Sequence, residues 1–142
     1  MEINYSLSET AATAERVLDL CGPDAVFALE GELGAGKTTL VAALCRRLGV
    51  AGGVSSPTYG IVHEYDGNRG TIYHLDCYRL KDTREAVDAG IEEILQRAPT
   101  AVFVEWPGVI EPLLPPDVVF LRFRHDPTDG SKRHLHITTG QP

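Results

Sequence analysis

The sequence predicts a single domain of the α/β class, and three observations support this prediction. The chain has 142 residues, which is enough for one hydrophobic core and too few for two. Short apolar runs that are typical of buried strands alternate with segments whose apolar residues recur at helical spacing. A glycine-rich segment at residues 31–38 joins one such run to one such helix. We therefore expect one domain across residues 1–142.

Composition excludes several classes of protein. Hydrophobic residues make up 43% of the chain, but no apolar run is long enough to span a membrane, and the N-terminus does not have the pattern of a signal peptide. The net charge of −7 argues against this domain alone holding nucleic acid, because basic side chains drive binding to phosphates. Cys21, Cys45 and Cys77 share no metal-ligand spacing, so we expect reduced thiols in a cytoplasmic protein without membrane contact.

The first predicted helix opens near residue 6. Ser6 and Glu9 match a capping box, and Ser8 is an alternative N-cap. Gly22 and Pro23 end the helix. Its predicted buried stripe consists of Leu7, Ala11, Ala14, Leu18 and Cys21.

Residues Gly31–Thr38 match the phosphate-loop pattern G-x-x-x-x-G-K-[ST] at every fixed position. The apolar run 25–29 before it reads as a buried strand, and the segment 40–48 after it has helical spacing. Glycines let backbone N–H groups approach a polyphosphate, Lys37 reaches the β- and γ-phosphates, and the Thr38 hydroxyl ligates Mg²⁺. A glycine-rich turn that matches by chance is the alternative. The surrounding strand and helix favour a site for a nucleoside triphosphate.

The segment after this helix is rich in small residues. Ser55, Ser56 and Thr58 offer hydroxyls to a phosphate or Mg²⁺, so the segment is either a γ-phosphate sensor or a plain linker. Residues 59–65 and 71–77 then predict two strands joined by a hairpin turn. Short helical patterns follow at residues 82–89 and 91–95.

Two predicted strands end in a carboxylate. Asp76 closes the strand 71–77, and Glu105 follows the run Val102–Val104, whose continuous apolar pattern indicates burial on both faces. Such acids ligate Mg²⁺ or orient water in phosphate-loop enzymes, and Glu105 is the stronger candidate for the metal. Arg79 either stabilises phosphate charge or pairs with an acid. Trp106 either packs in the core or touches a nucleotide or partner.

The last third of the chain predicts two closing strands, at residues 118–123 and 134–138. His134 and His136 lie two positions apart on one face of the second strand. No third metal ligand is nearby in the sequence, so we interpret them as a surface pair.

The order of these motifs resembles the TsaE (YjeE) family of bacterial ATPases, which act in forming N6-threonylcarbamoyladenosine at position 37 of tRNA. The resemblance covers the N-terminus to about residue 110. The motifs that carry it are Ser8-Glu9-Thr10, the phosphate loop with Thr39, Ser-Pro-Thr-Tyr at 56–59, His-Leu-Asp-Cys-Tyr-Arg-Leu at 74–80, Gly-Ile-Glu-Glu at 90–93, Val-Glu-Trp-Pro at 104–107 and, more weakly, Ser131-Lys132-Arg133.

The resemblance implies a phosphate-loop NTPase-like fold with a predominantly parallel central sheet flanked by helices. It also implies an ATP- and Mg²⁺-dependent ATPase that is weak alone and supports TsaB and TsaD, with tRNA reached only through these partners. Lys37 and Asp76 would be catalytic, Thr38 and Glu105 would ligate Mg²⁺, and the segment 56–58 would sense the nucleotide. The implied nucleotide contacts are Thr10, Gly34, Ala35, Gly36, Lys37, Thr38, Thr39, Thr58, Lys132 and Arg133.

Two other classes share the phosphate loop. A small-molecule kinase would need a lid or an acceptor-binding insertion, and no arginine-rich segment of that length fits in 142 residues. A GTP-dependent switch would need an Asn-Lys-x-Asp segment to read guanine, and the sequence contains none. Both alternatives are therefore less favoured than an ATPase subunit.

Overall fold

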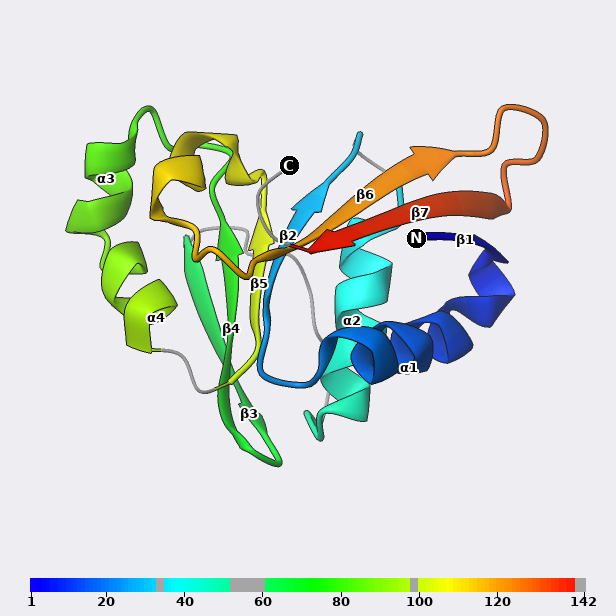
Figure 1. The fold of residues 1–142 in the computed structure, drawn as a ribbon, viewed down its shortest axis with the longest axis horizontal. Helices are drawn as coiled ribbons and strands as arrows, with labels where there is room; N and C mark the ends of the chain where they lie inside the picture. Colours follow the sequence, from blue (N-terminus) through cyan, green and yellow to red (C-terminus); the bar gives the residue numbers. More distant parts are fainter. Residues whose placement is uncertain (33–34, 52–60, 98–99, 140–142) are drawn as a thin grey trace.

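The structure, a computed structural model of the 142-residue chain, describes residues 1–32, 35–51, 61–97 and 100–139. Within these ranges the strands form one seven-stranded sheet with helices on both faces (Figure 1). The strands are β1 (Glu2–Ser6), β2 (Val26–Glu30), β3 (Val62–Gly67), β4 (Gly70–Asp76), β5 (Val102–Glu105), β6 (Val119–His125) and β7 (Lys132–Thr139). Their order across the sheet is β1-β7-β6-β2-β5-β4-β3. The predicted α/β class is confirmed.

The centre of the sheet is parallel and its outer parts are antiparallel. β6, β2, β5 and β4 run in the same direction. The hairpin partner β3 pairs antiparallel with β4 at one edge, and β7 and β1 add antiparallel strands at the other. The expected parallel arrangement therefore holds for the four central strands, while the sheet as a whole is mixed. Because parallel strands end at the same edge, the carboxyl ends of β2, β4 and β5 converge.

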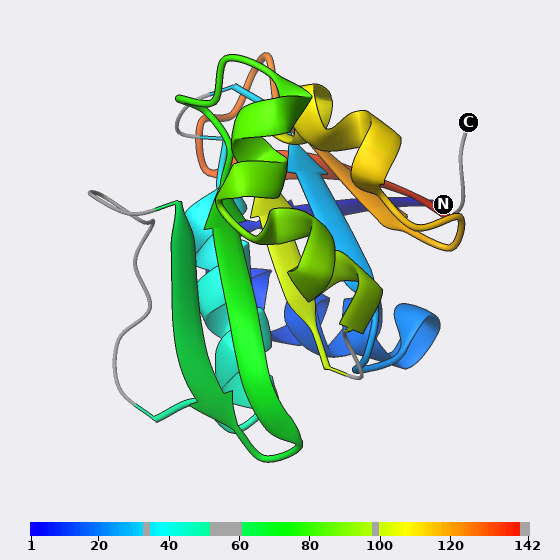
Figure 2. The same cartoon turned by 90° about the vertical axis from the view of Figure 1, so that its left-hand side faces the viewer.

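Helices cover the two faces of the sheet separately. α1 (Thr10–Cys21) and α2 (Lys37–Arg47) lie on one face, and α3 (Thr83–Asp88), α4 (Ile91–Arg97) and the 3₁₀ helix η2 (Pro107–Leu113) lie on the other (Figures 1 and 2). The predicted break between the helices at 82–89 and 91–95 falls at Gly90, which has φ 85°. The α1–α2 face carries the phosphate loop.

The core is divided by the sheet into two apolar layers. Along β2, Phe27 and Leu29 face α1 and α2, whereas Val26 and Ala28 face α3 and α4. Phe27 stacks on Phe103 of β5, with ring centroids 5.2 Å apart. The central strands are therefore buried on both faces, between the two helical layers.

The N-terminal segment differs from its prediction in two respects. The Ser6–Glu9 capping box is present, but it caps the 3₁₀ turn η1 (Leu7–Glu9), which leads directly into α1. Residues 2–6, for which no element was predicted, form the edge strand β1. Ile3 and Tyr5 are buried and alternate with exposed neighbours, and Ile3 pairs with Leu135 of β7. The start of the chain thus lies beside its last strand.

All three cysteines lie in the described ranges, and none forms a disulfide, as predicted. Burial raises the pKa of the Cys45 and Cys77 thiols to about 12, so both remain protonated at neutral pH. Of the helices that the structure describes, none has the length and apolar character needed to cross a bilayer.

Candidate functional site

The predicted phosphate loop connects the end of β2 to the first turn of α2. Its last glycine, Gly36, is the N-cap of α2 and has φ 98°, a left-handed conformation that glycine adopts without the steric cost of a Cβ. A Cβ on Gly31 would lie 3.0 Å from the carbonyl oxygen of Phe123, so a side chain at the start of the loop would be crowded by the backbone of β6. The predicted helix start at Lys37 is confirmed.

Lys37 is a buried lysine with 5% exposure. Its Nζ donates a hydrogen bond of 2.7 Å to the carbonyl oxygen of Gly31 and lies 3.7 Å from the centroid of the Trp106 ring. Burial lowers the pKa of the Lys37 amine, and the negative charges of Glu105 and Asp76 oppose that shift. The amine is therefore a poorly hydrated cation within the field of both strand-end acids.

Asp76 and Glu105 are the last residues of two neighbouring parallel strands. They are register partners between β4 and β5, so their side chains leave the sheet side by side on the α2 face. Asp76 is partly exposed and accepts a hydrogen bond of 3.0 Å from the backbone N–H of Tyr78. Glu105 is buried, with 4% exposure, and its Oε2 lies 2.5 Å from Nε2 of His74. One acid is thus open to solvent and the other is enclosed.

A cavity of about 380 Å³ lies between the start of α2 and these two acids. Its lining residues are Leu7, Gly36, Lys37, Thr38, Thr39, Asp76, Tyr78, Glu105, Trp106 and Arg133. In the described part of the chain, no group of three or more His, Cys, Asp or Glu side chains is placed to hold a metal ion.

Arg133 reaches the phosphate loop from the β6–β7 hairpin. It is 7% exposed, and its Nη1 donates to the carbonyl oxygens of Gly130 and Lys132 at 2.7 and 3.0 Å. Its Nε would lie 3.7 Å from a Cβ built on Gly36. The backbone N–H of Leu7 also donates to the hairpin, at the Ser131 carbonyl. Arg133 and Leu7 therefore form one wall of the cavity.

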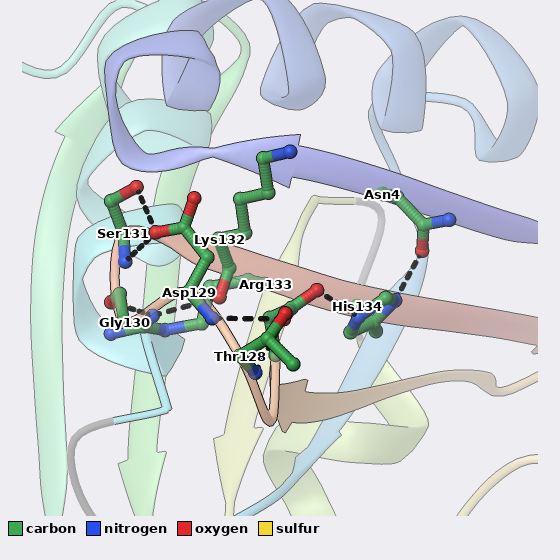
Figure 3. A network of polar contacts seen from close by, with 9 residues as sticks. Asn4, Thr128, Asp129, Gly130, Ser131, Lys132, Arg133 and His134 are labelled. Atoms are coloured by element: carbon green, nitrogen blue, oxygen red, sulfur yellow. Dashed lines mark hydrogen bonds and ion pairs between the residues drawn. The ribbon is translucent and has the colours of Figure 1, made fainter.

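The hairpin that carries Arg133 is fixed by a dense set of polar contacts (Figure 3). One carboxylate oxygen of Asp126 accepts from the backbone N–H groups of Thr128 and Asp129 and from the Thr128 hydroxyl. His134 lies between Asn4 and Asp126 and contacts both. Hydrogen bonds, chiefly those with Thr128, lower the pKa of Asp126 well below its usual range. His134 and His136 are both partly exposed on one face of β7, in agreement with the predicted surface pair.

Comparisons with known proteins relate this fold and cavity to one family. A sequence model of the family described as threonylcarbamoyl adenosine biosynthesis protein TsaE matches residues 5–135. The chain belongs to the TsaE family.

Individual relatives agree with this assignment. The tRNA threonylcarbamoyladenosine biosynthesis protein TsaE of Bacillus subtilis is 39% identical over 75% of this chain and 66% of that protein. The protein of the same name in Rickettsia conorii is 32% identical over 94% of this chain and 75% of that protein. The crystal structure of Bacillus subtilis YdiB superposes with a TM-score of 0.69 at 28% identity, and the match covers 99% of this chain and 86% of that one.

The cavity collects most of the residues that the TsaE resemblance implied. Gly36, Lys37, Thr38, Thr39, Asp76, Glu105 and Arg133 all line it. Ala35 is fully buried, and Lys132 is exposed and does not line the cavity. Thr10 is also buried, and its hydroxyl donates to the Leu7 carbonyl at 2.7 Å, so Leu7 and not Thr10 faces the cavity. Gly34 and the Ser55–Thr58 segment, including Thr58, lie outside the described residues.

Three lining residues had no predicted role or an open one. Trp106, for which the sequence left both a core role and a site role open, lines the cavity. Its φ of 57° is a left-handed conformation that is uncommon for a bulky residue. Tyr78 is 62% exposed and its ring centroid lies 5.1 Å from that of Trp106. Leu7 had no predicted role in the site; it was predicted in the buried stripe of the first helix, and that prediction is wrong, because Leu7 is 41% exposed. Both aromatic residues follow a strand-end acid closely and stand in motifs of the TsaE resemblance, at 74–80 and 104–107.

Proposed function

We propose that this chain is an Mg²⁺-dependent ATPase that supports formation of N6-threonylcarbamoyladenosine in tRNA. Family membership supports the tRNA-modification role, because the relatives carry that process in their names. The observation that carries the ATPase role is the geometry around Lys37, whose amine lies at the start of α2 in one cavity with two register-paired acids. A cation and two carboxylates in this arrangement serve a phosphate chain and its metal.

In this proposal, different residues of the cavity bind the phosphates, ligate the metal and orient the attacking water. Lys37 binds the β- and γ-phosphates once its amine leaves the Gly31 carbonyl. The Thr38 hydroxyl and the Glu105 carboxylate would hold Mg²⁺, which neutralises phosphate charge when it is bound. Asp76 would orient the attacking water, and its greater exposure than that of Glu105 supports this role. A volume of about 380 Å³ is in the range of small-molecule sites.

Local chemistry around the start of α2 also favours the binding of phosphates. The N-terminus of α2 adds its positive dipole end to the cavity. The backbone at Gly36 has no Cβ and a left-handed φ, which leaves the approach to that helix end open. Arg133 supplies a second cation to the cavity lining, close to Gly36.

In this proposal the chain acts through partners. Its net charge of −7 disfavours direct binding to tRNA, so TsaB and TsaD would hold the tRNA and this chain would contact it only indirectly. ATP hydrolysis would then reset the assembly between turnovers, and the isolated chain would be a weak ATPase.

An ATPase assay with and without TsaB and TsaD tests the proposal. We expect slow Mg²⁺-dependent release of phosphate from the chain alone and a clear acceleration when both partners are added. A chain that transfers phosphate rapidly to a small acceptor, without partners, would contradict the proposal and favour a kinase.

A further inference from the structure

His74 is a fully buried histidine that the proposed catalytic roles do not use. It lies on β4, two residues before Asp76, and its side chain has 0% exposure. Its Nε2 lies 2.5 Å from Oε2 of Glu105, which the proposed function assigns to Mg²⁺. A buried polar group in contact with a proposed metal ligand raises the question of what it does for that ligand.

The sheet register fixes the relation between His74 and the two acids. Asp76 pairs with Glu105, and His74 pairs with Phe103, one step further into the sheet. Because side chains alternate along a strand, His74, Asp76 and Glu105 all leave the same face. His74 and Glu105 are diagonal neighbours on adjacent strands, a separation that long side chains span. The imidazole therefore lies beneath the acids, on the side away from the cavity.

The hydrogen-bond pattern indicates which ring nitrogen carries the proton. Nδ1 of His74 is buried and has no hydrogen-bond partner among the described residues. A buried N–H without a partner is costly, and a carboxylate oxygen can only accept. The tautomer that satisfies both conditions carries its proton on Nε2 and donates it to Glu105. The ring centroid of Tyr65 on β3 lies 6.4 Å from that of His74.

We propose that His74 is a positioning residue that holds the Glu105 carboxylate in the orientation in which it ligates Mg²⁺. This inference rests on the proposed function, because it assigns His74 to the metal site of that ATPase. His74 touches neither nucleotide nor metal and acts through Glu105 alone.

Glu105 needs such a partner for two physical reasons. A glutamate side chain has several rotatable bonds, so an unrestrained carboxylate samples several orientations, and restricting it has an entropic cost. The group is also 4% exposed, and a buried carboxylate is tolerated only when it is hydrogen-bonded or paired. Donation from His74 addresses both, and Glu105 lines the cavity whereas His74 does not.

The competing interpretation is that His74 only satisfies a polar group in the core. Both interpretations predict that removing the imidazole lowers stability. They differ in Mg²⁺ binding, because a purely structural histidine affects the fold and not the affinity of the metal once the fold is intact.

Two amide substitutions separate these interpretations. The side-chain amide of His74→Gln reaches about as far as Nε2 and can donate to Glu105, whereas that of His74→Asn reaches only as far as Nδ1. Both remove the ring, so both lose packing against Tyr65. Glu105→Gln serves as the reference for a site without the carboxylate charge.

The measurement is calorimetric binding of the non-hydrolysable analogue AMP-PNP to the full chain, in EDTA and over a series of Mg²⁺ concentrations. We expect His74→Asn to raise the Mg²⁺ concentration for half-maximal effect about 10-fold, the lower end of the range for residues that orient metal ligands. His74→Gln should stay near wild type, and affinity in EDTA should be the same in all variants. Equal Mg²⁺ dependence in His74→Asn and wild type would overturn the inference.

A spectroscopic measurement on the wild-type chain does not depend on the variants folding. The imidazole ¹⁵N resonances of His74 should show a protonated Nε2, and they should shift when Mg²⁺ is added to the AMP-PNP complex. A proton on Nδ1 alone, or resonances that do not shift when Mg²⁺ is added, would overturn the inference. Either result would leave the ATPase proposal intact. If Mg²⁺ had no effect on AMP-PNP binding to wild type, this result would contradict both the proposed function and this inference.

Discussion

Replacing Asp76 with asparagine separates its proposed chemical role from its structural one. The substitution keeps the shape of the side chain and an oxygen that can accept the 3.0 Å hydrogen bond from the Tyr78 N–H. It removes the negative charge that would orient or deprotonate water. Asp76→Ala also removes the acceptor, so the difference between the two variants reports the hydrogen bond alone.

The expected magnitudes follow from these contacts. Loss of a group that assists proton transfer costs about 10²–10⁴ in kcat, or about 3–5 kcal/mol in activation free energy. Loss of the hydrogen bond to Tyr78 costs about 1 kcal/mol in unfolding free energy, and it applies to alanine only. Lys37 and Glu105 remain in place in both variants, so nucleotide affinity should change little.

The assay compares kcat for ATP with the Kd of AMP-PNP in the presence of Mg²⁺. Asp66→Asn is the matched control, because Asp66 is an exposed aspartate on the neighbouring strand β3, away from the cavity. We expect wild-type behaviour in the control and a large loss of kcat at unchanged Kd in Asp76→Asn. Wild-type kcat in Asp76→Asn, or an equal loss of binding and turnover, would refute the reasoning.

Four further predictions test other parts of the account. Lys37→Ala should abolish nucleotide binding measured by calorimetry, since it removes the cation on the phosphates; retained affinity would contradict the proposed site. Glu105→Ala should weaken the Mg²⁺-dependent part of binding, and unchanged metal dependence would move the metal role to Asp76. Fluorescence of Trp106, the single tryptophan, should change as nucleotide binds, because the Lys37 amine must leave a position 3.7 Å from its ring; no change would argue that the amine stays there. The pKa of Asp126 is lowered in the folded protein, so its contribution to stability is present above the usual value of 3.8 and is lost as the pH falls further. Denaturant unfolding of wild type and Asp126→Ala should therefore converge in acid, and a gap that persists there would exclude this linkage.

Local signals in the sequence were sufficient for the phosphate loop and the two strand-end acids. The loop lies between an apolar run and a helical pattern that are contiguous in the chain, so its context was readable without tertiary information. Asp76 and Glu105 each follow a short apolar strand, and neighbouring parallel strands necessarily bring their ends together. These features depend on short segments and one general rule of sheet geometry.

Features that depend on distant segments were not predicted. The strand β1 pairs with β7, and its alternation of buried and exposed residues was too short to be distinguished from a flexible terminus. Leu7 lines the cavity and the Thr10 hydroxyl donates to the Leu7 carbonyl, an arrangement set by η1 that the sequence did not indicate; the nucleotide contact of Thr10 stays a prediction. His74 and Glu105 are 31 positions apart, and only the register of β4 and β5 brings them together.

Repeated modification of tRNA tests the central claim most directly. A mixture of TsaB, TsaD, the threonylcarbamoyl donor and excess tRNA would be assayed for N6-threonylcarbamoyladenosine over many turnovers, with wild-type chain, Lys37→Ala or no chain. We predict sustained formation of the modified nucleoside with wild type and ATP, and arrest after about one turnover with Lys37→Ala, as without the chain. Equal multiple-turnover yields with wild type and Lys37→Ala would contradict the account.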